Sequence, residues 1–243
     1  MQEVRISEMT WMEVEKAISE ARAVILPLGS TEQHGYHMPT RTDNTVAEYM
    51  SIELAKRTNS LVLPVLPYGQ VWSAKGFPGT YSLKERTFIN VIKDLVISLE
   101  ESGAKNVILF SGHFGNMNPC KIAARELLDD FGYSNVYHLG YMNIKELSKG
   151  IMETEFWNGS GFHAGELETS VVLSIEESMV RRELIQEEYP PIPLDIEIRP
   201  IPWKSFVKQG IFGDPAKASK EKGAAFIERW LNFLVELIIT NID

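Results

Sequence analysis

The chain has 243 residues, which suits one large α/β domain with a sizeable core, and we expect a single domain over residues 1–243. Its net charge of -9, from 24 Lys and Arg against 33 Asp and Glu, argues against a nucleic-acid partner, because such proteins need clustered positive charge. The one cysteine excludes an internal disulfide, and no uncharged apolar run is long enough to cross a bilayer, so we expect a cytoplasmic protein without a membrane partner.

Short apolar runs alternate along the chain with longer segments of helical periodicity. The runs are typical of buried strands and are predicted at 23–28, 61–65, 107–110 and 136–139. The periodic segments predict helices at 45–58, 82–102, 118–131 and 215–239. Ser82 with Glu85 is a candidate capping box for the second helix, and Asp214 with Pro215 is expected to open the last. This alternation predicts an α/β fold with a mostly parallel sheet covered by helices on both faces.

A proline-rich segment, residues 187–202, separates the last predicted helix from the rest of the chain. Its prolines favour an extended backbone and oppose a regular helix. We expect an arm or a long connection that belongs to the same domain or to a subunit contact.

Polar side chains gather after the first predicted strand. Glu32, His34 and His37 lie on a glycine-bearing connection, and Asp43 stands just before a predicted helix. In an extended segment Glu32 and His34 point to the same side, and oxygen and nitrogen donors this close suit a divalent cation in a hydrolase. Each residue alone has an ordinary explanation, because Asp43 is also a good helix cap and the others also suit a solvated loop.

A second histidine, His113, follows the third predicted strand in a similar glycine-bearing connection. Sites in parallel sheets lie beyond the carboxyl ends of the strands, so His113 is expected to meet Glu32 and His34 there. Paired-metal hydrolases hold ions roughly 3.5 to 4 Å apart with a shared bridging ligand, and Asp43 is our candidate for that bridge. The combination favours a metal site over helix capping.

The third candidate group is His163, Glu166 and Glu168, just before another helical pattern. If these residues form the first helical turn, His163 and Glu166 share a face and Glu168 points elsewhere. We therefore predict Glu166 as a metal ligand with a catalytic role, and His163 as general acid or base. The alternative is that the acidic residues complement the helix dipole, which explains Glu168 better than His163.

The loop of residues 72–80 follows the second strand and belongs at the same edge. Its aromatic residues and Lys75 could surround a small polar ring or bind a substrate anion, although a lone loop lysine is usually only solvated. The residues that we assign to substrate binding are Lys75, Phe77, Thr80, Phe114 and Trp157.

Six motifs in this order resemble the creatininase (creatinine amidohydrolase) family over nearly the whole chain; they lie at residues 28–35, 42–43, 77–80, 112–116, 163–170 and 213–215. The resemblance implies a three-layer α/β/α sandwich, assembly into homohexamers, and two divalent ions per subunit, of zinc, manganese or iron. By position it implies that Glu32 and His113 hold one ion, that His34 holds the other, and that Asp43 bridges them.

This chain departs from creatininase itself at three positions. Creatininase has a metal-binding glutamate two residues after the histidine that matches His113, where this chain has Gly115, and we expect Glu166 to replace that ligand. It also has a tyrosine in place of Phe114 and a tryptophan four residues before the histidine that matches His163, whereas Trp157 lies six before. Creatinine is therefore not the expected substrate.

These features predict a hydrolase in which a metal-bridging hydroxide attacks a carbonyl of a small polar, cyclic amide or formamide, with His163 handling the leaving-group proton. A second hypothesis is hydrolytic C–C ring opening of a cyclic diketone such as an oxidised inositol, a reaction that the family resemblance includes. A third is a noncatalytic, metal-stabilised binding or scaffold protein, which requires closed coordination and no turnover.

Overall fold

A parallel four-stranded sheet organises the computed structural model, which describes residues 3–154 and 163–242. The strands run in the order β2-β1-β3-β4, and every neighbouring pair is parallel. The strands are β1 (Val24–Leu28), β2 (Leu61–Val62), β3 (Val107–Ser111) and β4 (Val136–Leu139). The α-helices of the described ranges are α1 (Trp11–Glu20), α2 (Thr42–Thr58), α3 (Glu85–Glu101), α4 (Met117–Phe131), α5 (Ile144–Ser148), α6 (Glu166–Ile175) and α7 (Lys220–Asn241).

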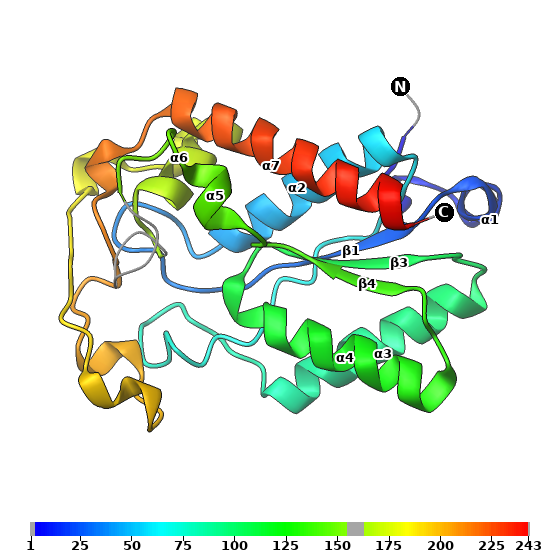
Figure 1. Cartoon of the computed structure of the whole chain (residues 1–243), viewed down its shortest axis with the longest axis horizontal. Helices are drawn as coiled ribbons and strands as arrows, with labels where there is room; N and C mark the ends of the chain where they lie inside the picture. Colours follow the sequence, from blue (N-terminus) through cyan, green and yellow to red (C-terminus); the bar gives the residue numbers. More distant parts are fainter. Residues whose placement is uncertain (1–2, 155–162, 243) are drawn as a thin grey trace.

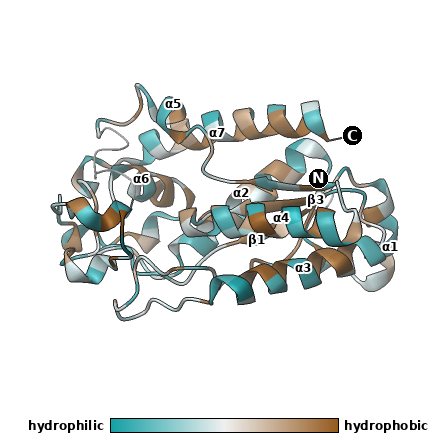
Figure 2. Cartoon of the chain, turned by 60° about the horizontal axis from the view of Figure 1, so that its bottom comes forward, coloured by the Kyte–Doolittle hydropathy of each residue, from teal (hydrophilic) through white to brown (hydrophobic). Residues whose placement is uncertain are grey.

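Helices cover both faces of the sheet, which gives the predicted three layers (Figure 1). Helices α2 and α7 pack on one face around a core that includes Trp230, while α3 and α4 pack on the other around Phe88. Every residue of β1 and β3 is buried, as expected for strands covered on both sides. Figure 2 shows these two strands as hydrophobic ribbons between the helices.

The connections that follow β1 and β3 diverge at the carboxyl ends of these two neighbouring strands. These strands are neighbours in full register from Val24 opposite Val107 to Leu28 opposite Ser111. The chain leaves β1 toward α2 on one face and leaves β3 toward α4 on the other (Figure 1). In open α/β sheets, ligands bind where successive connections diverge in this way.

Three predicted helix starts were wrong. Helix α2 begins at Thr42, three residues before the predicted start, so Asp43 lies within its first turn. Helix α3 begins at Glu85 after Lys84, and the Ser82 hydroxyl accepts a hydrogen bond from the Val71 N–H instead of capping the helix. Asp214 caps a short 3₁₀ turn, Pro215–Lys217, whereas α7 begins at Lys220 with Ser219 as its cap. The Ser82 hydroxyl is engaged by a distant loop residue and cannot cap α3. A separate 3₁₀ turn lies between Asp214 and the start of α7.

The proline-rich segment forms an arm with one short 3₁₀ turn, Leu194–Glu197, consistent with the extended connection that its prolines predict. Leu194 and Ile198 on this arm are almost fully exposed. Across residues 3–154 and 163–242, no helix combines the length and apolar character of a membrane span.

Candidate metal centre

Six titratable side chains converge at the carboxyl edge of the sheet. Two lie on the connection after β1, one is the second residue of α2, one lies two residues after the end of β3, and two flank the start of α6. All are buried except the last, which is partly exposed. They are Glu32, His34, Asp43, His113, His163 and Glu168.

Local geometry explains how the connection after β1 presents its ligands. The Glu32 N–H donates to the Thr40 carbonyl, and a bridge pairs His34 with Met38, so the segment folds back as a tight hairpin-like turn. Gly35 turns the chain with a φ of +64°, a conformation that glycine adopts without strain. The fold thereby brings the Glu32 and His34 side chains to the start of α2.

The first group consists of Glu32, Asp43 and His113. His113 Nδ1 lies 3.1 Å from Glu32 Oε2 and 2.9 Å from Asp43 Oδ2. The other ring nitrogen, Nε2, lies 2.9 Å from the Gln70 carbonyl oxygen, so its N–H donates there. This bond fixes the tautomer that turns the Nδ1 lone pair toward the two carboxylates, the arrangement that a metal-binding histidine needs.

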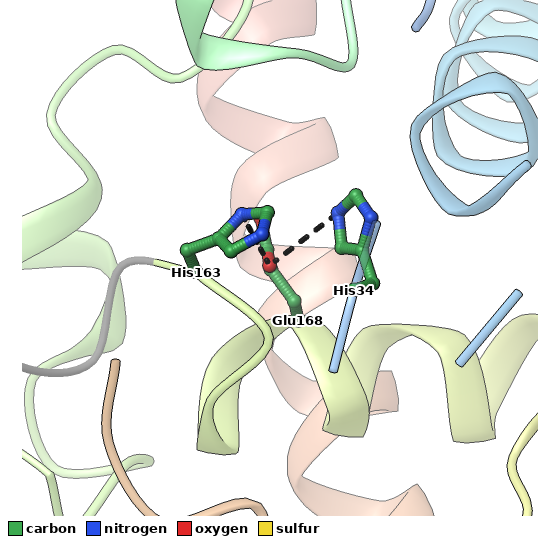
Figure 3. A group of neighbouring side chains, drawn as sticks. All are labelled: His34, His163 and Glu168. Atoms are coloured by element: carbon green, nitrogen blue, oxygen red, sulfur yellow. Dashed lines mark ion pairs between the residues drawn. The ribbon is translucent and has the colours of Figure 1, made fainter. Parts of the chain in front are cut away.

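The second group consists of His34, His163 and Glu168 (Figure 3). The Glu168 carboxylate faces both imidazoles, with Oε2 3.8 Å from His34 Nε2 and 3.9 Å from His163 Nδ1. His34 Nε2 also lies 3.1 Å from Asp43 Oδ1. Asp43 therefore turns one oxygen toward each group, as its predicted bridging role requires.

Opposite charges dominate the electrostatics of these groups. Burial alone would lower the pKa of His34, but Asp43, Glu168 and Glu32 raise it to about 10. Burial is likewise outweighed at His113, whose pKa is raised well above its usual value by Glu32 and Asp43. His163 differs, because burial dominates and lowers its pKa to about 4. In the protein without metal, protons on two imidazoles thus balance the buried carboxylates.

These side chains fit divalent cations. Glu32 Oε2 and His34 Nε2 are fully buried, and their contacts to His113 Nδ1 and Asp43 Oδ1, both at 3.1 Å, are ion pairs without regular hydrogen-bond geometry. Buried polar atoms that lack a regular hydrogen bond are rare and are typical of a site for an ion or a water. Carboxylate and imidazole donors suit zinc, manganese and iron, so the donor chemistry agrees with the predicted ligand types.

Glu166, predicted as a ligand and a catalytic group, lies away from both groups. Its carboxylate accepts hydrogen bonds from the Glu153 and Thr154 N–H groups and pairs with Lys222 Nζ at 2.6 Å. The i, i+3 argument failed because α6 begins only at Glu166, so His163 lies before the helix. The glutamate that faces His34 and His163 is Glu168.

Other predicted residues have different surroundings. His37 is buried outside both groups, with Nε2 2.9 Å from the Thr169 hydroxyl. Phe114 is half-exposed directly beside His113, whereas Lys75 is exposed. Phe77 is buried beneath the Lys204 ammonium, and the Thr80 hydroxyl accepts a hydrogen bond from the Gln33 N–H. Trp157 falls outside the described residues.

Three residues near the centre escaped the sequence reasoning. Gln33 contacts His163 twice. Its backbone carbonyl oxygen and its side-chain Nε2 each lie 2.9 Å from His163 Nε2. The Trp203 ring lies 4.9 Å from the His163 ring, and Tyr141 is close enough to Glu168 for that charge to raise its pKa, after the larger effect of burial. Tyr141 follows β4, so the strand-end rule that identified His113 could have found it.

Comparison with known proteins gives one consistent family. A family model described as creatininase (creatinine amidohydrolase) matches residues 7–238. The chain is 27% identical over 239 residues to creatinine amidohydrolase of Pseudomonas putida, covering 93% of this chain and 92% of that one. It is 26% identical over 262 residues to 3-dehydro-scyllo-inosose hydrolase of Thermotoga maritima, covering 97% and 82%.

Solved creatininase structures share the fold. A manganese form matches with a TM-score of 0.85 and 26% identity, covering 98% of both chains. A mutant of the Zn–Zn type matches with a TM-score of 0.84 at the same identity and coverage. These two solved creatininases are therefore a zinc form and a manganese form.

Proposed function

The chain belongs to the creatininase family and is a hydrolase of that family, and on this premise we propose that it uses two divalent cations to cleave the C–N bond of a small polar, cyclic amide or formamide. The main support is the position of Asp43, whose two oxygens face two separate donor groups. Matching creatininases in manganese and Zn–Zn forms support the choice of cation.

In this proposal Glu32 and His113 would hold one cation, His34 and Glu168 would hold the other, and both groups would share Asp43. When bound, such a pair supplies a nucleophile at neutral pH and polarises a carbonyl oxygen. The helix α2 orients the bridge, because Asp43 lies in its first turn, where the helix dipole favours a negative charge. The Ser30 hydroxyl donates to Asp43 Oδ2 at 2.7 Å and holds the carboxylate in place.

His163 is the proposed proton carrier, and Gln33 equips it for that role. Gln33 presents both an acceptor, its carbonyl oxygen, and a donor, its side-chain amide, 2.9 Å from His163 Nε2. Nε2 is therefore satisfied whether or not it carries a proton. Nδ1, which faces the centre, can then accept a proton during attack and return it to the leaving nitrogen.

Phe114 is the proposed substrate contact beside the cations, because its half-exposed ring directly follows His113. Lys75 stays in the proposal only as a candidate for binding an anionic group at the entrance. Phe77 and Thr80 shape the adjoining loop through buried packing and the hydrogen bond to Gln33.

A second candidate reaction is hydrolytic C–C ring opening of a cyclic diketone. The similarity to 3-dehydro-scyllo-inosose hydrolase over 97% of this chain favours it. The same residues would act on a ketone carbonyl, and the leaving group would be a carbon that takes its proton from His163. The alternative that is not an enzyme is a noncatalytic, metal-stabilised binding protein.

The deciding experiment combines metal analysis of the purified protein with a screen of lactams, formamides and cyclic ketones. We expect two ions per chain, turnover that EDTA abolishes and manganese or zinc restores, and loss of both activity and one ion in Asp43→Asn. Release of an amine identifies amide hydrolysis, and ring opening without an amine identifies C–C cleavage. Two bound ions without any turnover would favour the binding protein, and an Asp43→Asn variant that keeps both ions and full activity would defeat the bridge.

A further inference from the structure

We propose that Asn116 is a positioning residue for His113, because its side-chain amide holds the loop whose Gln70 carbonyl orients the imidazole. This inference deepens the proposed function and rests on it for the role of His113 as a metal ligand. Asn116 is completely buried and ends the 3₁₀ turn, Phe114–Asn116, that directly follows His113.

The Asn116 amide joins the three connections that follow β1, β2 and β3. Its Nδ2 donates to the Gly29 carbonyl at 2.9 Å, and its Oδ1 accepts a hydrogen bond from the Gln70 N–H at 2.9 Å. One partner is an acceptor and the other is a donor, so the side chain must offer both functions at once. An amide does so without a charge, whereas a carboxylate would face the Gly29 carbonyl without a proton to donate.

Gln70 passes this contact on to the imidazole. Asn116 holds the Gln70 N–H, while the carbonyl oxygen of Gln70 lies 2.9 Å from His113 Nε2. The backbone of His113 is held separately, because the Ser111 hydroxyl donates to the His113 carbonyl at 2.7 Å. The Gln70 carbonyl therefore restrains the rotation of the ring itself. Loss of such a partner of a metal-binding histidine costs about 10- to 100-fold in metal affinity.

Gly69 allows the loop to approach this closely. A Cβ atom at this position would collide with Asn116 Oδ1 and would lie 2.7 Å from the Gly29 carbonyl oxygen. An added methyl group would therefore push the loop, and Gln70 with it, away from Asn116. Gly69→Ala thus disturbs the same contact from the opposite side and leaves every candidate metal ligand unchanged.

The first test measures zinc binding by calorimetry in wild type, Asn116→Ala and Gly69→Ala. We expect the affinity of the first group, identified as the binding phase that His113→Gln abolishes, to fall about 10- to 100-fold in both variants, with a smaller change at the second group. The matched control is Asn106→Ala. The Asn106 amide donates to the Arg22 carbonyl at 2.9 Å, just before the amino ends of β3 and β1, so this variant should keep wild-type zinc affinity. Equal losses at both groups, or unchanged affinity in both test variants, would overturn the positioning role.

Asn116→Asp serves as the milder variant if Asn116→Ala does not fold. The carboxylate keeps an acceptor for the Gln70 N–H and loses the donor to the Gly29 carbonyl. We expect its zinc affinity at the first group to lie between those of wild type and Gly69→Ala. Wild-type affinity in Asn116→Asp together with Gly69→Ala would count against the proposal.

The second test needs neither turnover nor metal. The bond to the Gln70 carbonyl requires a proton on His113 Nε2, whether or not an ion is bound. In protein that carries isotope-labelled histidine, NMR should show this N–H as a slowly exchanging signal, assigned by its loss in His113→Gln. We expect rapid exchange in Asn116→Ala and Gly69→Ala and slow exchange in Asn106→Ala. Slow exchange in all three variants would overturn the inference.

The two tests separate this inference from the proposed function. If the wild type binds no zinc but the His113 signal responds as expected, the positioning role stands and the proposed function fails. If the wild type binds two ions and hydrolyses an amide while Asn116→Ala and Gly69→Ala leave both the signal and the affinity unchanged, the proposed function stands and the positioning role is rejected.

Discussion

Two glutamates in the first turn of α6 should respond in opposite ways to the same substitution. Glu166 is fully buried, accepts hydrogen bonds from two backbone N–H groups and pairs with Lys222 at 2.6 Å. In Glu166→Gln the NH2 group of the new amide is a donor that faces the backbone N–H donors of Glu153 and Thr154. Lys222 also loses its buried charged partner. Breaking a buried charge pair costs about 3 to 5 kcal/mol. Because Lys222 remains partly exposed, we expect a loss of about 3 kcal/mol in the free energy of unfolding, with metal binding retained.

Glu168→Gln should leave stability intact and weaken metal binding. In the metal-free protein burial, ahead of the repulsion from Asp43, raises the pKa of Glu168 to about 7, so its carboxyl group is already partly protonated near neutral pH and a neutral glutamine in its place should cost little stability. Loss of even an indirect metal contact costs about 10- to 100-fold in affinity, so loss of a ligand should cost at least about tenfold.

The assay uses urea unfolding of both metal-free variants, followed by zinc binding measured by calorimetry and by metal content after dialysis. Wild-type protein and the two variants form a matched set, because the substitutions are chemically identical and two residues apart. The assignment of Glu168 would be refuted if Glu166→Gln lost one ion while Glu168→Gln kept both at wild-type affinity.

Three further predictions follow from individual contacts. Removing metal with EDTA should lower the melting temperature, and adding manganese should restore it. The reason is that binding to the folded state alone adds about 2.7 kcal/mol to the free energy of unfolding when free metal is 100 times Kd. An unchanged melting temperature in calorimetry would contradict a preformed metal site. Burial lowers the pKa of His37 to about 4, below its unfolded value of 6.5, so its contribution to stability is complete above pH 6.5 and is lost as pH falls to about 4. The difference between wild type and His37→Gln in urea unfolding should therefore fall by about 3 kcal/mol across that window, and a flat difference would show that His37 is not buried neutral. A methyl group in Gly115→Ala would collide with the His113 imidazole and the Gln70 carbonyl, so the metal affinity should fall about tenfold in equilibrium dialysis, and wild-type affinity would show that His113 is not held there.

The sequence was sufficient for the parts of the centre that depend on strand ends. Glu32, His34 and His113 were predicted together because apolar runs locate β1 and β3, and parallel topology brings their carboxyl ends to one edge. The family resemblance added the layers and the metal pair, and the family model and solved structures confirm the fold.

The remaining differences between prediction and structure arose from local backbone conformation and from side chains that are distant in the sequence. The choice of Glu166 over Glu168 required the start of α6 to within one residue, and Ala164, at a φ of +50°, turns the chain before the helix begins. Lys222, 56 residues away in the sequence, pairs with the Glu166 carboxylate. No rule based on residue spacing predicts such a long-range pair. Trp203 reaches His163 only because the arm returns to the loop at Ser73.

Asp43 belongs to a helix that is anchored in the hydrophobic core rather than to a loop. Further along α2, Ala47, Met50 and Leu54 are completely inaccessible to solvent. The spacing between the two donor groups is consequently set by the position of the whole helix, and substitutions in the core beneath α2 can alter that spacing without touching any of the six converging side chains. The geometry of the two donor groups is therefore coupled to the packing of the protein interior.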